Sequence, residues 1–174
     1  MMERIVIVGT SGSGKTTVSA RLAGLLDIPH IELDSLHWEP GWQEAEPSVL
    51  RSRVEEALAG NRWVVDGNYS IVRDLIWPQA DRLVWLDYRL ARVMWQVTTR
   101  TARRVIGRQE LWSGNRERLA AAFSRDSIIL WALTTFKKNR RRYTALLESP
   151  TAAHMQKVRL RSPRQAKAWL SQLP

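Results

Sequence analysis

The 174-residue chain contains no cysteine, and it has no long apolar run. Without cysteine, neither a disulfide nor a thiolate metal site can form, and this composition suits a reducing compartment. The longest apolar stretch, near residues 128–136, is too short to span a bilayer. The first residues lack a basic segment leading into an apolar one, so we expect no signal peptide. These absences favour a cytoplasmic protein without a membrane partner.

Acidic residues are scarce in the second half of the chain. Residues 1–87 carry 8 Lys/Arg and 13 Asp/Glu, whereas residues 88–174 carry 19 and 4. Arginine supplies 22 of the 27 basic residues, and its planar guanidinium binds phosphate oxygens in pairs. The imbalance indicates either a nucleic-acid surface or a cluster of side chains that holds phosphates.

A glycine-rich motif directly follows the first apolar run. Residues 9–16 read Gly-Thr-Ser-Gly-Ser-Gly-Lys-Thr and fit the pattern G-x-x-x-x-G-K-[ST]. In such a loop, backbone N–H groups and the following helix N-terminus bind phosphate oxygens. The lysine adds charge for the β- and γ-phosphates, and the threonine hydroxyl ligates Mg²⁺. We therefore expect ATP and Mg²⁺ as cofactors. The expected binding residues are Gly9, Thr10, Ser11, Gly12, Ser13, Gly14, Lys15, Thr16 and Thr17.

Apolar runs alternate with helical patterns along the chain. Strands are expected at residues 4–8, 30–33, 63–65, 82–86 and 157–160, the last at a sheet edge, with a loop over residues 34–46. This alternation predicts a three-layer α/β fold in which a five-stranded parallel sheet carries helices on both faces. We find no linker that would separate a second domain, so residues 1–174 are expected to form one.

Three aspartates follow predicted strands. Asp87 precedes a helix and is interpreted as its N-cap, so Asp66 is the preferred partner of Thr16 in binding Mg²⁺. Asp34 is expected to face the crevice where ligands bind, either orienting an acceptor hydroxyl or acting as a general base. A turn-forming role for Asp34 is the alternative. The other expected substrate-binding residues are His37, Trp38 and Asn68.

An arginine-rich helical region is predicted over residues 88–147, with breaks near Gly107 and residues 113–115. Positioned arginines stabilise the charge that develops on a transferring phosphoryl group. We therefore expect the catalytic residues to be Lys15, Asp66, Arg100, Arg104 and Arg108. The three arginines would be carried on a lid that closes over the triphosphate. For any single arginine, a solvated helix face is the competing interpretation.

These motifs resemble the adenylate-kinase-like branch of P-loop kinases. Within that branch, residues 33–38, residues 63–69 and the arginine-rich run through Arg142 most resemble the topology modulation protein (FlaR-like) group. The resemblance implies the P-loop NTPase fold with strand order 2-3-1-4-5, an acceptor-binding segment at residues 34–60 and a lid after strand 4. Adenylate kinases have Phe-Pro-Arg where this chain has Asn68-Tyr69-Ser70, which puts AMP as the acceptor in doubt. The Asp34 motif is also similar to that of shikimate- and gluconate-type kinases.

The sequence thus predicts an ATP-dependent phosphotransferase acting on a nucleotide, a nucleoside or another small molecule. The alternative is a nucleic-acid-binding regulator that uses ATP as a switch, with weak ATPase activity. The basic second half supports this alternative, but helix-turn-helix and zinc-finger spacings are missing from the sequence.

Overall fold

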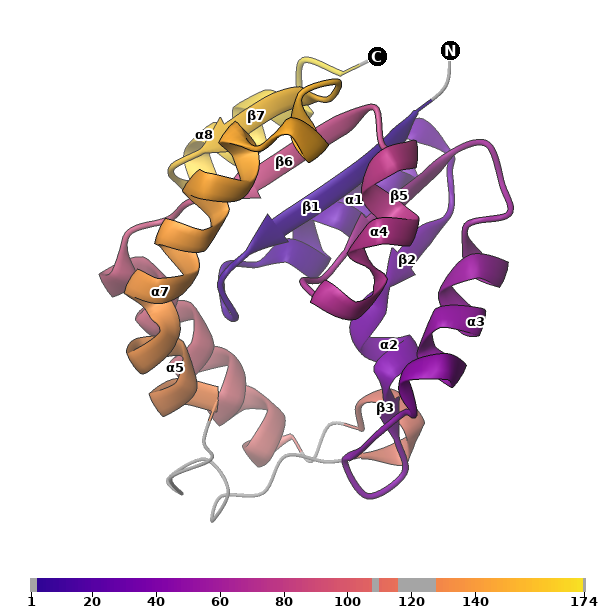
Figure 1. Ribbon diagram of the computed structural model, residues 1–174. Coiled ribbons are helices and arrows are strands. Elements are labelled where there is room, and N and C mark those ends of the chain that lie inside the picture. The colour runs from indigo at the N-terminus through magenta and orange to yellow at the C-terminus, as the bar shows by residue number, and fades with distance from the viewer. Residues whose placement is uncertain (1–2, 108–109, 116–127, 174) are drawn as a thin grey trace.

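The computed structural model describes residues 3–107, 110–115 and 128–173. Its main sheet has five parallel strands in the order β2-β5-β1-β6-β7 (Figure 1). Numbered along the chain, this is the order 2-3-1-4-5, as predicted, with the last strand at an edge. The strands are β1 (Arg4–Gly9), β2 (His30–Glu32), β5 (Trp63–Asp66), β6 (Arg82–Leu86) and β7 (Gln156–Leu160).

The central strand β1 divides the core between the two faces of the sheet. Ile5 and Ile7 point into one apolar cluster, whereas Val6 and Val8 point into the other. This alternation follows from the two-residue repeat of a strand. Because helices cover both faces, both sets of side chains are buried, and the strand is apolar throughout.

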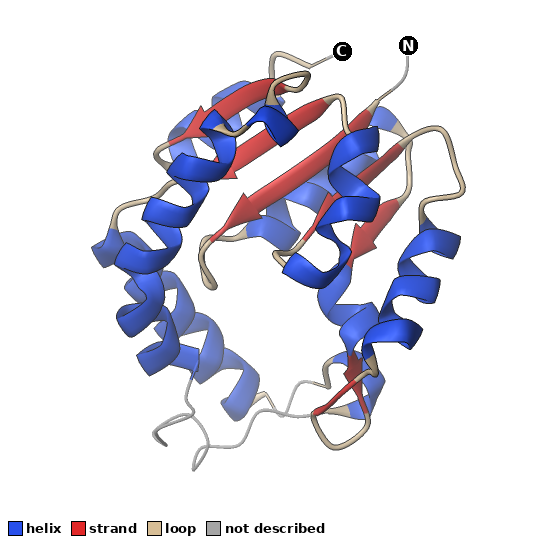
Figure 2. Cartoon of the chain, viewed as in Figure 1, coloured by secondary structure: helices blue, strands red, loops and turns tan. Residues whose placement is uncertain are grey.

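Helices form the two outer layers, as Figure 2 shows. Helices α1 (Lys15–Leu26) and α8 (Pro163–Leu170) pack on the Ile5 face, while α3 (Pro47–Ala57) and α4 (Arg73–Ile76) pack on the Val6 face. Helices α5 (Leu90–Ile106) and α7 (Ile128–Glu148) pair with each other and extend beyond the sheet (Figure 1). Within the described ranges, no helix combines the length and apolarity needed to cross a membrane.

The segment after β2 is more regular than predicted. The expected loop over residues 34–46 contains helix α2 (Leu33–His37) and a hairpin of β3 (Trp38–Glu39) and β4 (Gln43–Glu44). Gly41 and Trp42 have φ angles of 76° and 60°, which reverse the chain between the two short strands. The loop prediction was therefore wrong, because residues with positive φ form a hairpin turn here.

Two further elements differ from prediction. Residues after β5 form the 3-10 helices η1 (Ser70–Val72) and η2 (Trp77–Gln79) on either side of α4, where no helix was predicted. Asp87 is not a helix cap, because α5 begins only at Leu90 and the buried Asp87 carboxylate binds two arginines instead.

Candidate active site

The phosphate loop, residues 9–16, connects β1 to α1. Gly12 and Gly14 have φ angles of 81° and 85°, which favour glycine, and Gly14 is the N-cap of α1. A Cβ atom on Gly12 would lie 2.8 Å from Cβ of Val97, so the loop packs tightly against α5. Within the loop, Ser13 N–H donates to the Thr10 carbonyl at 3.0 Å. The loop therefore has the conformation and the helix N-terminus that bind phosphate.

Lys15 lies at the centre of a cluster of charges. Burial lowers the pKa of Lys15, while the carboxylates of Asp34, Asp66 and Glu32 raise it and the guanidinium of Arg100 lowers it. Its Nζ atom lies 3.5 Å from the Thr10 carbonyl oxygen. Asp34 and Asp66, predicted from two strand ends, and Arg100, predicted from the arginine-rich helix, are thus close enough to influence one ammonium group.

Thr16 connects the loop to two carboxylates. Its hydroxyl donates to Oε1 of Glu32 at 3.0 Å and lies 3.4 Å from Oδ1 of Asp66. The other Asp66 oxygen is 2.7 Å from Nε2 of His30, and the Asp66 side chain is only 2% exposed. Glu32 and Asp66 are neighbours because β2 and β5 pair in register at these two residues. The three side chains form a compact group of oxygen atoms beside the phosphate loop.

Asp34 lies in the first turn of α2, not in the loop that the sequence predicted. Its Oδ1 atom accepts a hydrogen bond of 2.6 Å from the Tyr69 hydroxyl. Burial and the nearby carboxylate raise the pKa of Tyr69 well above its ordinary value of 10.0, so the phenol stays protonated and donates. The buried His37 ring packs against the rings of Tyr69 and Trp38, with centroid distances of 4.4 and 4.8 Å. Tyr69 therefore fixes the orientation of Asp34.

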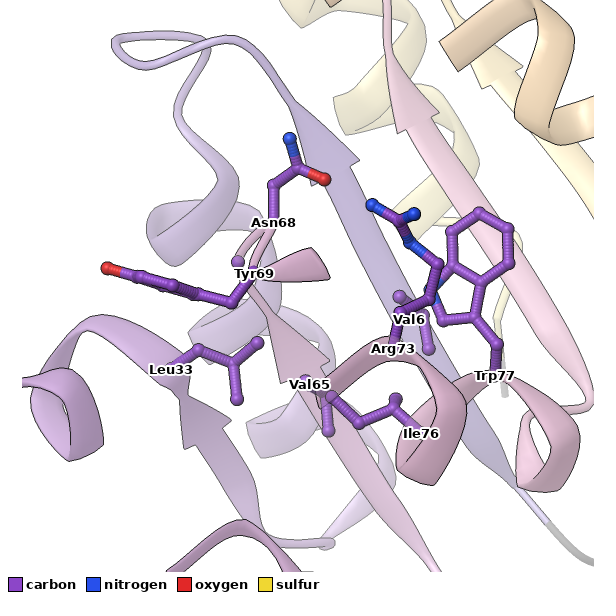
Figure 3. A pocket seen from close by; sticks show the side chains of 9 residues that line it. Val6, Leu33, Val65, Asn68, Tyr69, Arg73, Ile76 and Trp77 are labelled. Atoms are coloured by element: carbon purple, nitrogen blue, oxygen red, sulfur yellow. The ribbon is translucent and has the colours of Figure 1, made fainter. Parts of the chain in front are cut away.

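A pocket opens beside this pair, between the end of β5 and α4. Figure 3 shows Asn68, Tyr69, Arg73 and Trp77 around it, with apolar side chains from β1 and β5 also in its lining. Asn68 thus lines a cavity, whereas Trp38 contacts other rings in the hairpin. Three of the four predicted substrate-binding residues lie around Tyr69. Asp34 accepts its hydrogen bond, His37 packs on its ring, and Asn68 lines the same pocket.

The hairpin after α2 is in contact with the segment that follows α5. The rings of Trp38 and Trp42, and those of Trp42 and Trp112, meet edge to face at centroid distances of 5.6 and 6.4 Å. Trp112, in the 3-10 helix η3 (Trp112–Gly114), donates its Nε1–H to Oε2 of Glu32 at 3.0 Å. Asn115 accepts from the Trp42 backbone N–H and donates to the Glu39 carbonyl. The predicted break at residues 113–115 is therefore where the segment after α5 contacts the β3–β4 hairpin.

The three predicted lid arginines have different positions. The charge of Arg100 acts on Lys15, and Arg104 is half-buried further along α5. Arg108 lies outside the described residues. Farther along the chain, Arg140 is paired with a carboxylate: its Nε lies 2.9 Å from Oδ1 of Asp87.

Three residues in this arrangement were missed by the sequence analysis. Glu32 ends β2 as Asp66 ends β5, so the position of a carboxylate at a strand end was an available signal. Tyr69 and Trp112 had no comparable signal, because their partners lie 35 and 80 residues away along the chain.

The overall fold can be compared with solved structures. A shikimate kinase from Bacteroides thetaiotaomicron matches with a TM-score of 0.56 over 99% of this chain and 96% of that chain, at 15% identity. A gluconokinase from Sinorhizobium meliloti 1021 matches with a TM-score of 0.53 over 98% of this chain and 93% of that chain, at 21% identity. The chain has the fold of these P-loop kinases. At these identities the likeness concerns the fold and leaves the FlaR-like branch unresolved.

Sequence comparison adds a short match. Over 34 residues the chain is 50% identical to a shikimate kinase of Enterococcus faecalis (strain ATCC 700802 / V583). The match spans about a fifth of that curated relative and a fifth of this chain. No family model matches the sequence.

Proposed function

We propose that this chain is a Mg·ATP-dependent phosphotransferase that phosphorylates a hydroxyl group of a small metabolite. The observation that carries the proposal is the position of Asp34, whose charge acts on Lys15 while its orientation is fixed by Tyr69. A lysine that binds phosphates and an oriented carboxylate that binds an acceptor hydroxyl would hold the donor and the acceptor between which the phosphoryl group is transferred.

ATP binding is assigned to the phosphate loop and α1. The left-handed glycines hold the loop in its tight turn, and Lys15 contacts the β- and γ-phosphates. Arg100 approaches the same region from α5 and stabilises the charge on the transferring group. Arg104 and Arg108 complete this role from the lid region, and residues 34–60 form the segment that binds the acceptor.

The residues around Thr16 fit a magnesium ion. Mg²⁺ prefers oxygen ligands and one or two carboxylates, and the Thr16 hydroxyl lies within 3.4 Å of carboxylate oxygens from Glu32 and Asp66. Thr16 and Asp66 are the ligands we assign, with Glu32 orienting the hydroxyl. When bound, the ion neutralises negative charge on the β- and γ-phosphates.

The acceptor site is assigned to Asp34, His37, Trp38 and Asn68. Asp34 accepts a hydrogen bond from the reacting hydroxyl, while Tyr69 holds the carboxylate in place. The structural relatives are named for shikimate and gluconate, which are hydroxylated acids, and these compounds head the panel of acceptors to test.

The test is acceptor-stimulated release of ADP. The protein is incubated with Mg·ATP and with shikimate, gluconate, nucleosides or nucleoside monophosphates, with Lys15→Ala as the control. We expect stimulation by one class of acceptor in the wild type and none in the variant. Equal turnover by the Lys15→Ala protein would refute the assignment of the phosphate loop, and slow hydrolysis unaffected by every acceptor would count against a kinase.

The alternative, an ATP-switched regulator that binds nucleic acid, is supported by the excess of basic residues after residue 88. Part of that charge is used inside the fold, because Arg140 and Arg159 pair with Asp87. Duplex binding that weakens steeply with salt and changes with ATP would favour this alternative.

A further inference from the structure

One charged side chain in the pocket of Figure 3 has no assigned role. Arg73, on α4, lies beside Asn68 with its guanidinium 5.3 Å from the centroid of the Trp77 ring. Val6, Val65 and Ile76 supply apolar walls. The pocket is thus an apolar cavity with a cation held on an aromatic ring, next to the residues assigned to the acceptor.

The Arg73 guanidinium lacks a partner that its surroundings require. Its Nη2 atom is buried and makes no hydrogen bond within the described part of the chain. Burial is the main cause that lowers the pKa of Arg73; the charge of Arg142 lowers it further, and Tyr143 raises it. An arginine remains charged at neutral pH even so, and a buried charged donor without an acceptor is unfavourable.

Two arginines of the neighbouring helix α3 have carboxylate partners. Arg51 makes a two-point contact with Asp74, and Arg53 lies 2.9 Å from a Glu39 oxygen. Asp74 follows Arg73 directly in sequence, yet its carboxylate binds Arg51. In the described structure, Arg73 therefore has no carboxylate partner even though the next residue in the sequence is an aspartate.

We propose that Arg73 determines substrate specificity by binding an anionic group, a carboxylate or a phosphate, on the acceptor. This inference rests on the proposed function, because it takes the pocket as part of the acceptor site. Trp77 positions the guanidinium, and Asn68 supplies a neutral polar contact beside it. Tyr69 lines the same pocket, and its hydroxyl, on the side away from Arg73 in Figure 3, binds Asp34; the acceptor we propose spans from Arg73 past Tyr69 to that carboxylate.

The experiment compares charged and neutral ligands of similar shape. Binding of gluconate against glucitol, its neutral open-chain counterpart, and of AMP against adenosine, is measured by calorimetry with ADP saturating the phosphate loop. Wild type is compared with Arg73→Gln and with Arg141→Gln, which removes an exposed arginine of α7. The two ligand pairs separate a carboxylate from a phosphate as the recognised group.

We expect wild type to bind the charged member of one pair about tenfold or more tightly than its neutral partner, as for a hydrogen bond to a charged group. Arg73→Gln should abolish that preference while leaving the neutral ligand unchanged, and Arg141→Gln should behave as wild type. An unchanged preference in Arg73→Gln, or no preference in wild type for either pair, would overturn the proposal. Should Arg73→Gln fold poorly, Arg73→Lys keeps the charge but loses the planar fork, and a weakened preference is expected.

Turnover separates this inference from the proposed function. Charged-ligand binding that depends on Arg73 without any ADP release would leave the inference standing and refute the kinase. Phosphorylation of an acceptor with the same charged-to-neutral ratio of kcat/KM in wild type and Arg73→Gln would do the reverse.

Discussion

The ends of β5 and β6 carry two buried aspartates that look alike in sequence and differ in their surroundings. Both follow apolar strands that flank β1, and both side chains are 2% exposed. Asp66 contacts a histidine and a threonine hydroxyl beside Lys15, whereas Asp87 contacts the guanidinium groups of Arg140 and Arg159. Asp87 is thus paired with two cations, whereas Asp66 shares its surroundings with the phosphate loop. The comparison teaches that two strand-end carboxylates that look alike in sequence can have different kinds of partner: two arginines at Asp87, and a histidine and a threonine hydroxyl at Asp66.

The largest expected difference is between Asp66→Asn and Asp87→Asn. Asp66→Asn should lower turnover at limiting Mg²⁺ by about 10- to 100-fold, because a ligand group loses its charge. Asp87→Asn should leave turnover near wild type and lower the free energy of unfolding by about 2 kcal/mol. This is less than for a fully buried pair, because both arginines are partly exposed.

Steady-state kinetics over a Mg²⁺ series and thermal unfolding measure the two effects. For a domain of this size, the Asp87→Asn change corresponds to a fall in Tm of about 4–8 °C. The comparison fails if Asp87→Asn is the variant that loses Mg²⁺-dependent turnover.

The phosphate loop and the helix α1 that follows it offer a pair of glycine substitutions, one in each. Gly12→Ala places a methyl group against Val97 at a φ of 81°, so we expect the KM for ATP to rise about tenfold as the loop shifts. Gly24→Ala is the control, because its Cβ meets open space in the interior of α1. That change should raise stability by about 0.5–1 kcal/mol without altering KM. Equal KM values for the two variants would contradict the packing of the loop.

The pH dependence of the reaction should reflect the Asp66 end of the sheet. Burial lowers the pKa of Lys15 from its ordinary value of 10.5, so the charged form needed for phosphate binding is lost at a lower pH. We expect kcat/KM for ATP to fall as the pH rises, before 10.5 is reached. The limb for kcat should lie higher, because bound phosphates stabilise the ammonium. Coincident limbs in the two profiles would show that Lys15 is not the titrating group.

The smallest expected effect concerns the hydrogen bond from Trp112, in η3, to Glu32. Trp112→Phe removes the indole N–H that donates to Glu32, and we expect kcat/KM to fall about two- to fivefold. Trp95→Phe alters a tryptophan that is 65% exposed on α5 and should change nothing. A similar loss in both variants would indicate a general effect on α5 and η3, unrelated to Glu32.

The sequence predicted the sheet better than the site. The apolar runs at β1, β5 and β6 are buried on both faces, so their composition identifies them as strands, and the order of strands follows from the family resemblance. The hairpin after α2 was missed because its turn uses Trp42 at positive φ, which a non-glycine residue rarely adopts.

The sequence could rank Asp66 above Asp87 as a candidate magnesium ligand, but it could not identify the partners of either carboxylate. Asp87 was taken for a helix cap because its true partners, Arg140 and Arg159, lie 53 and 72 residues away. The preference for Asp66 agrees with its position beside Thr16, and its role in binding Mg²⁺ remains a prediction. Glu32 could have been noticed as a carboxylate at a strand end, whereas Tyr69 becomes visible as a neighbour of Asp34 only once α2 is placed beside the end of β5.

The central claim is that the residues around Lys15, at the Asp66 end of the sheet, catalyse transfer of a phosphoryl group from ATP to an acceptor hydroxyl. The most direct test follows the γ-phosphorus of labelled ATP into products, with wild type and Lys15→Ala incubated with shikimate or gluconate. The account predicts a labelled phosphate ester of one acceptor with wild type and none with the variant. Label found only as inorganic phosphate, whatever the acceptor, would contradict it.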